Sequence, residues 1–222
     1  MLKIGVIHAT CSAVEPLNRA AKSYRDDISV LNFVNENLLF RANCVGGADD
    51  VGLRTFAKTF FEAADAGVDG IIVACSVYTP YVELMKKFVR IPVIGIDNPM
   101  LRAAIETGNK IGIIATTASS GPSAQKQLMR MAEEYGKQAE FEIGINTEGM
   151  TQLKAGNIEA HNKIILEEGK KLVEKGCDCI VLAQITMACA AEGMKDLGVP
   201  VLTSPMEGVK AIVSLIEAGC NN

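Results

Sequence analysis

The chain alternates between short apolar runs and longer segments in which apolar residues recur at helical spacing. Apolar runs bounded by turn residues are typical of strands buried on both faces of a parallel sheet. The expected strands are 2–8, 28–34, 71–74, 93–96, 111–116, 139–145, 179–183 and 201–203. The expected helices are 14–26, 50–66, 80–89, 98–107, a segment reaching about residue 135, 161–175, 187–197 and 205–218. A polar loop is expected around residues 43–47, and residues 147–156 fit either a short helix or a loop. Alternating strands and helices predict an α/β protein with mostly parallel sheets.

The plan of the chain occurs twice. Residues 67–80 contain an apolar strand that ends on Cys75, and residues 176–187 repeat the pattern with Gln184 in the place of Cys75. The openings of the two halves, 3–10 and 110–117, also correspond. Such a repeat predicts two similar lobes. We expect lobe one to comprise 1–97 plus 204–222 and lobe two 98–203, each a mostly parallel sheet flanked by helices, with an active-site cleft between them.

Composition restricts the classes of function. A hydrophobic content of 49% and a charged content of 22% are ordinary for a globular protein. The net charge of −4 and the lack of a Lys/Arg cluster argue against a nucleic-acid partner. No apolar run is long enough to span a membrane, and the first residues enter a strand pattern rather than an export signal. Seven cysteines, an odd number, favour reduced thiols, and we expect a cytoplasmic protein.

Cys75 is the leading candidate for chemistry. It follows an apolar strand and precedes small hydroxylated residues and Pro80, which suits the first turn of a helix. In open α/β sheets, ligands bind at the carboxyl ends of the strands, where backbone N–H groups can stabilise a thiolate. Such surroundings can lower the pKa of a thiol and make it a base or a nucleophile. The alternative is a buried structural cysteine.

These motifs resemble the aspartate/glutamate/hydantoin racemase superfamily. In that family a first-lobe motif is usually Cys-Asn-Thr, and here it is Cys75-Ser76-Val77. The second motif is usually Gly-Cys-Thr, and here Ala183-Gln184-Ile185 stands in its place. The resemblance implies a cofactor-independent enzyme in which one cysteine removes a proton next to a carboxyl or carbonyl and a second returns it. It also implies a small carboxylate or hydantoin as substrate and often a homodimer.

Gln184 changes what the resemblance implies for the reaction. A glutamine amide donates hydrogen bonds but does not exchange protons usefully near neutral pH. We therefore expect Gln184 to orient the substrate or to stabilise an oxyanion. Three alternatives to a two-thiol racemase stay open: a single-thiol decarboxylase, a cis–trans isomerase similar to maleate isomerase, and a non-catalytic small-carboxylate-binding protein.

His8 and several hydroxyl groups complete the predicted site. His8 ends the first strand, and a neutral imidazole there can act as acid or base, or it can simply brace the loop. Carboxylate anchoring would fall to residues that follow the strand ends of both halves. The predicted substrate-binding residues are Thr10, Ser12, Ser76, Val77, Thr116, Thr117, Ile185 and Thr186. Ser119 and Ser120 are expected to cap a helix that has Pro122 in its first turn.

Metal and nucleotide sites are not expected. Cys177 and Cys179 have no second Cys/His pair at zinc spacing, and Cys179 should point into the core. The chain has no Gly-x-Gly-x-x-Gly motif after its first strand and no P-loop. His161, near a helix start, is expected at the surface, and Cys189 in the core.

Overall fold

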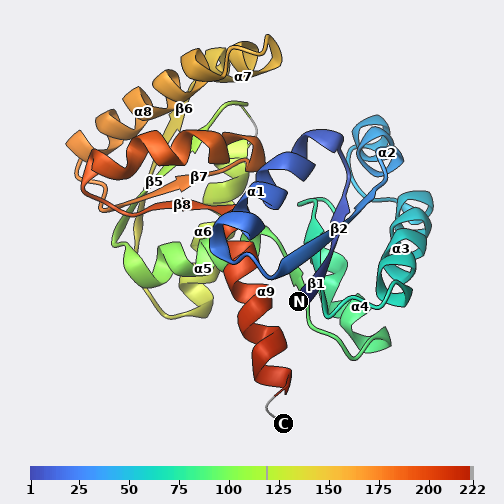
Figure 1. Ribbon diagram of the computed structural model, residues 1–222. Helices are drawn as coiled ribbons and strands as arrows, with labels where there is room; N and C mark the ends of the chain where they lie inside the picture. Colours follow the sequence, from blue (N-terminus) through green and yellow to red (C-terminus); the bar gives the residue numbers. More distant parts are fainter. Residues whose placement is uncertain (119, 221–222) are drawn as a thin grey trace. The chain divides into compact units, whose positions relative to one another are not determined.

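The computed structural model describes residues 1–118 and 120–220 and divides into two compact units (Figure 1). Unit 1 comprises Met1–Pro99 with Pro205–Asn222, and unit 2 comprises Met100–Ser204. Ser119, which the sequence places in a helix cap, lies outside the described residues. No helix in the described part of the chain is both long and apolar enough to cross a membrane.

Unit 1 is built on a four-stranded parallel sheet with the strand order β2-β1-β3-β4. Its strands are β1 (Leu2–His8), β2 (Ile28–Val34), β3 (Gly70–Ala74) and β4 (Val93–Gly95). Its helices are α1 (Val14–Tyr24), α2 (Asn37–Val45), α3 (Asp50–Asp65), α4 (Val82–Met85), α9 (Ser204–Cys220) and the 3₁₀ turns η1 (Cys11–Ala13), η2 (Thr79–Tyr81) and η3 (Lys86–Phe88).

The central strand β3 is buried along its whole length, as its unbroken apolar run predicts. On one face, Ile71 and Val73 pack with Phe56 and Phe60 of α3. On the other face, the absent side chain of Gly70 leaves room for Ile212 and Ile216 of α9. β3 is therefore covered on both sides, and its chain reaches a ligand at its carboxyl end and in the loop that follows.

Unit 2 repeats this arrangement with the strand order β6-β5-β7-β8, again parallel. Its strands are β5 (Lys110–Ala115), β6 (Glu140–Ile145), β7 (Cys179–Leu182) and β8 (Val201–Thr203). Its helices are α5 (Asp97–Thr107), which begins in unit 1, α6 (Ser120–Glu134), α7 (Thr147–Lys154), α8 (Ile158–Glu174) and the 3₁₀ helix η4 (Ile185–Leu197). Helices α5 and α6 pack on one face of the sheet, and α8 and η4 pack on the other.

Three expected segments differ from the structure. The polar loop predicted around residues 43–47 is the end of helix α2, which stops at Gly46 with a left-handed φ of 78°. The helix expected over 80–89 is broken into η2, α4 and η3. The helix expected over 187–197 begins at Ile185 and has 3₁₀ geometry, since apolar spacing alone does not separate a period of 3.0 from one of 3.6.

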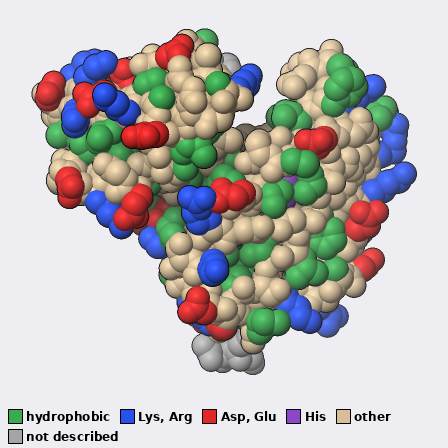
Figure 2. Space-filling model, turned by 45° about the horizontal axis from the view of Figure 1, so that its top comes forward, with side chains coloured by type: hydrophobic (Ala, Val, Ile, Leu, Met, Phe, Trp, Pro, Cys, Tyr) green, Lys and Arg blue, Asp and Glu red, His purple; other side chains and the backbone are tan. Residues whose placement is uncertain are grey.

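Acidic and basic side chains lie next to one another on the face shown in Figure 2. Several ion pairs of the described residues join side chains three or four positions apart on one helix, such as Arg54 with Asp50 and Lys170 with Glu167. Exposed pairs of this kind contribute little to stability.

Candidate active site

Cys75 follows β3 directly and begins a tight turn. Its carbonyl oxygen accepts hydrogen bonds from the backbone N–H groups of Tyr78 and Thr79 at 3.0 and 3.1 Å, and from the Thr79 hydroxyl at 3.2 Å. The Tyr78 ring is buried, stacks on Phe56 with 5.1 Å between centroids, and donates its hydroxyl to the Leu38 carbonyl. The turn that carries the thiol is thus anchored in the core, while Cys75 itself stays partly exposed.

The expectation of a lowered thiol pKa at Cys75 is wrong. Burial raises the pKa of Cys75, and the negative charge of Asp97 raises it further. Hydrogen bonds from the backbone N–H groups of Val77 and Tyr78 act in the opposite direction but do not outweigh the burial. Cys75 is therefore a protonated thiol at neutral pH that already has two donors in place for a thiolate.

Asp97 is a site residue that sequence reasoning missed. The Ser76 hydroxyl donates to Asp97 Oδ2 at 2.6 Å, a short hydrogen bond typical of a charged acceptor. The strand register brings Ser76 and Asp97 together. Val73 of β3 pairs with Gly95 of β4, so the residues that follow the two strands lie side by side. The sequence signal that could have identified Asp97 is a carboxylate placed shortly after a buried strand, where ligands bind in parallel sheets.

His8 is fully buried at the end of β1. Its Nε2 lies 2.9 Å from Asn32 Oδ1, and Asn32 donates its amide to Asn18 at 3.2 Å. This orientation of Asn32 leaves Nε2 as the donor, so Nδ1 carries a free lone pair, buried and without a partner in the described residues. Burial lowers the pKa of His8, with the Asn32 bond a smaller opposing effect, and the ring is neutral.

Thr10 and Ser12 lie in the loop after β1. The Thr10 hydroxyl oxygen caps η1 by accepting from the Ser12 N–H at 3.4 Å, and the two hydroxyl oxygens are 3.1 Å apart. The neighbouring Cys11 N–H donates to Glu36 at 3.2 Å. These hydroxyls therefore have a local capping role beside their predicted role in binding.

In unit 2, Gln184 directly follows Ala183, just beyond β7, and its side-chain oxygen is saturated. The oxygen accepts from the Thr116 N–H at 2.7 Å, the Thr116 hydroxyl at 2.9 Å and the Ser120 hydroxyl at 3.1 Å. A backbone N–H cannot accept, so the amide cannot be flipped without losing that bond. The NH₂ group has no hydrogen-bond partner in the described residues and is available to a ligand.

The remaining predicted residues of unit 2 lie near this amide. Thr116 is buried against Gln184, and the Thr117 and Ser120 hydroxyls are 2.6 Å apart. Ile185 is half-buried. The Thr186 hydroxyl is buried without a partner in the described part of the chain.

His161 corrects another expectation. It is fully buried rather than on the surface, and its Nδ1 donates to the Gly149 carbonyl at 2.7 Å. A Cβ on Gly149 would lie 2.9 Å from the Thr116 methyl group, so Gly149 packs closely on Thr116. His161 thus holds Gly149, Gly149 packs on Thr116, and Thr116 holds the Gln184 side chain. Cys189 is half-buried, and its thiol donates to Asn162 at 3.3 Å.

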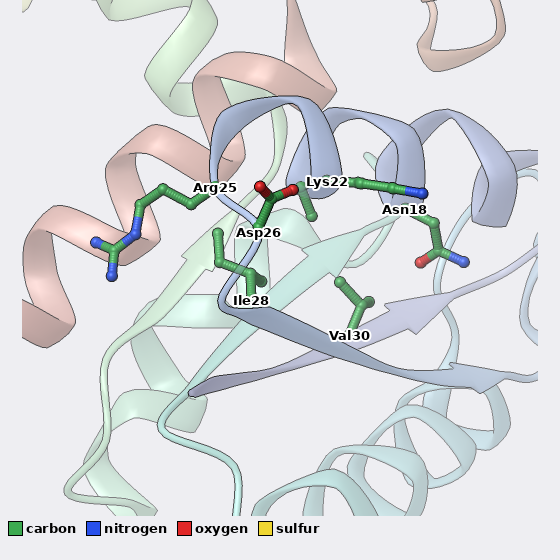
Figure 3. A pocket seen from close by; sticks show the side chains of 7 residues that line it. Asn18, Lys22, Arg25, Asp26, Ile28 and Val30 are labelled. Carbon is green, nitrogen blue, oxygen red and sulfur yellow. The ribbon is translucent and has the colours of Figure 1, made fainter.

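Other features do not form a second centre. Cys179 is fully buried, as expected, and burial raises its pKa to about 12. No group of three His, Cys, Asp or Glu side chains in the described residues could hold a metal ion. A pocket of about 300 Å³ beside α1 and β2 is lined by Asn18, Ala21, Lys22, Arg25, Asp26, Ile28 and Val30 (Figure 3). Arg25 already pairs with Asp27 and Glu217, and no predicted site residue lines this pocket.

The chain is a duplicated α/β protein. Each of its two units has a parallel sheet with polar groups just after the central strands. A family model described as Asp/Glu/Hydantoin racemase matches residues 4–212. The chain belongs to this Asp/Glu/Hydantoin racemase family.

The individual relatives share about a quarter of their aligned residues with this chain. The chain is 27% identical to the hydantoin racemase of a Pseudomonas species over 161 residues, 71% of this chain and 62% of the relative. It is 25% identical to an uncharacterized protein of Schizosaccharomyces pombe over 156 residues, 68% of this chain and 63% of the relative. The matches thus span less than two thirds of these two curated relatives. The allantoin racemase structure from Klebsiella pneumoniae has a TM-score of 0.70 at 19% identity, covering 99% of this chain and 89% of that one, and so shares the fold.

Proposed function

We propose that this chain is a cofactor-independent isomerase of the racemase/epimerase class. It acts on the carbon next to the carboxyl or carbonyl of a small acid, amino acid or hydantoin, and Cys75 is its base or nucleophile. The observation that carries the proposal is the position of Cys75, directly after β3, in a turn where the backbone N–H groups of Val77 and Tyr78 favour its thiolate. Family membership supports the reaction class.

Because Cys75 is a thiol at neutral pH, it first gives its proton to water and becomes a thiolate, which then accepts a proton from the substrate. The thiolate takes the proton from the substrate carbon, and the electron pair of the C–H bond moves onto the carbonyl or carboxyl oxygen. We propose that Gln184 donates its free N–H bonds to that oxygen, because its own oxygen is held by Thr116 and Ser120. Return of the proton from the Cys75 thiol to the carbon regenerates the thiolate. Where water protonates the opposite face instead, the carbon is inverted, and the Cys75 thiol gives its proton to the hydroxide that is left. The proposal requires Cys75 and Gln184 to act on one bound substrate.

The remaining predicted residues take supporting roles in this proposal. Thr10, Ser12 and Ser76 are hydroxyls at strand ends of unit 1, where they would bind the polar groups of a small carboxylate or hydantoin. His8 stays a prediction as a second acid–base group, with its free Nδ1 as the atom that would act. The six cysteines from Cys11 to Cys189 are all free, which supports a cytoplasmic location. A homodimer stays a prediction.

Proton exchange tests the proposal. Glutamate, aspartate and 5-methylhydantoin are incubated with the protein in deuterated water, and deuterium at the α-carbon is followed by NMR. Cys75→Ala should lower the exchange rate by about 10²- to 10⁴-fold, the range for loss of a positioned acid–base group. Cys44→Ala, which removes an exposed thiol of the same unit, is the matched control. Full exchange in Cys75→Ala would overturn the proposal.

Gln184 in place of a second thiol favours one alternative, a decarboxylase or cis–trans isomerase that uses Cys75 alone. Carbon dioxide release from a substituted malonate, or conversion of maleate to fumarate, would identify it. In either case α-proton exchange on the amino acids and the hydantoin should be absent. Binding of these compounds without turnover would instead indicate a small-carboxylate-binding protein.

A further inference from the structure

Asp97 lies beside the turn that carries Cys75. It opens α5, and its Oδ2 accepts the hydroxyl of Ser76, the residue after Cys75, at 2.6 Å. The negative charge of Asp97 disfavours the thiolate and so raises the pKa of Cys75. The carboxylate is therefore linked to the thiol both by the chain, through Ser76, and by charge.

Asp97 has no counter-ion in the described part of the chain. No Lys, Arg or His forms an ion pair with it, and its one side-chain hydrogen bond comes from the neutral Ser76. Asp50, which opens α3 in the same way, instead pairs with Arg54 at 2.8 Å. Burial raises the pKa of Asp97. Asp97 stays partly exposed. A carboxylate that is partly withdrawn from water without a cation is less stable than a paired one, and a cation supplied by a ligand would remove that cost.

The other ionisable groups near this loop carry no charge that could balance Asp97. His8, which pairs with Ala74 in the register of β1 against β3, is buried with a lowered pKa and is neutral. Tyr78 donates its hydroxyl to the Leu38 carbonyl. Helix α9 approaches at Gly208, where an added Cβ would lie 3.3 Å from Ile96, and its Glu207 pairs with Lys210 at 2.8 Å. Asp97 is thus the group whose charge near Cys75 remains to be balanced.

We propose that Asp97 is a specificity-determining residue that binds a protonated amine on the ligand and, through that amine, activates Cys75. In the empty site the unpaired carboxylate adds to the effect of burial and disfavours the thiolate form of Cys75. When a cationic amine pairs with Asp97, the local negative charge is cancelled and the sulfur gives up its proton more readily. This deepens the proposed function and rests on the role given there to Cys75. It favours a ligand with a charged amine over a neutral hydantoin ring.

Alkylation of the thiol tests the effect of the charge without any turnover. The rate of iodoacetamide reaction at Cys75 is measured by mass spectrometry of its peptide across pH 6–10 in wild type and Asp97→Asn. Asparagine keeps a side-chain oxygen at the start of α5 and removes only the charge. The alkylation midpoint should shift to lower pH, with up to about tenfold faster reaction near pH 7.5, because one pKa unit is tenfold in thiolate. Asp50→Asn should leave the profile unchanged. Superimposable profiles for Asp97→Asn and wild type would overturn the proposal.

Ligand charge is tested by calorimetry with two probes of known charge. Alaninamide carries a protonated amine and no carboxylate, and 5-methylhydantoin is neutral. Alaninamide should bind wild type and lose about tenfold in affinity in Asp97→Asn, which corresponds to about 1.4 kcal/mol. The affinity of 5-methylhydantoin should not change. No binding of alaninamide to wild type, or equal affinity in the variant, would overturn the proposal. The Cys75→Ala exchange test is independent of both results, so the two proposals can fail separately.

Discussion

The side-chain oxygen of Gln184 is bound by Thr116 twice, through the backbone N–H at 2.7 Å and the hydroxyl at 2.9 Å. Thr116 directly follows β5, and Gln184 stands just beyond the neighbouring strand β7. Two rigid strand ends therefore fix the amide plane, and the NH₂ group keeps one direction without a ligand. Preorganised donors of this kind are effective at stabilising developing negative charge.

Removal of one of these donors should loosen the amide. In Thr116→Val the backbone N–H still holds Gln184, but the buried hydroxyl is lost. We expect a loss of about 1 kcal/mol in unfolding free energy, typical of one hydrogen bond, and a several-fold fall in the α-proton exchange rate. Urea unfolding and NMR exchange measure the two effects. Thr107→Val, which removes an exposed hydroxyl that donates only to Ala103, is the control and should leave exchange unchanged.

A thiol at position 184 should change the stereochemical outcome. Wild type has one thiol and one amide at its two central strand ends, so it should exchange the α-proton faster than it racemises the substrate. In Gln184→Cys a second acid–base group stands at the position of the family's second cysteine. We expect the ratio of racemisation to exchange to rise, as followed by chiral chromatography beside NMR. An unchanged ratio in a folded Gln184→Cys would show that side chain 184 does not face the reacting carbon.

The parallel strands could be predicted because burial on both faces leaves a continuous apolar run. Gly70–Ala74 is the clearest case. Helix α2 was missed because it has only nine residues, no side-chain cap at Glu36, and two glycines after it. Local sequence gives a short helix of this kind little support, and its packing through Leu38 and Ala42 is what holds it.

Some residues of the candidate site could also be predicted from local sequence, and others could not. Cys75 and Gln184 could be found because each lies just after a central strand of its sheet, Cys75 after β3 and Gln184 one residue further on after β7. Asp97 and His161 were missed or misplaced because tertiary contacts decide their surroundings. The register of β3 against β4 places Asp97 beside Ser76. A hydrogen bond to the Gly149 carbonyl holds the His161 ring in the interior. The direction of the Cys75 pKa also depends on burial, which the motif does not encode.

Gly95 should be required for the geometry of the Cys75 turn. A Cβ at this position would lie 3.0 Å from the Thr79 hydroxyl oxygen and closer still to the Thr79 methyl group. Thr79 donates two hydrogen bonds to the Cys75 carbonyl, so its displacement moves the turn. Gly95→Ala should cost about 1–3 kcal/mol in unfolding free energy, as for other overpacked sites, and should alter the alkylation rate of Cys75. Gly193→Ala, where a Cβ meets no atom within 4 Å, should be close to neutral.

The buried His8 should make the protein less stable in mild acid. Its pKa in the folded state is depressed below the ordinary value of 6.5, so below that pH the unfolded chain binds a proton that the folded chain does not. The stabilisation is therefore fully present above 6.5 and is lost as the pH falls toward the folded-state pKa. The loss at pH 5.5 can reach at most about 1.4 kcal/mol, one pKa unit. In His8→Gln, whose amide can still donate to Asn32, this part of the pH dependence should vanish. Urea unfolding of both proteins at pH 7.5 and 5.5 measures it, and parallel losses in the two would show that His8 takes up its proton freely in the folded state.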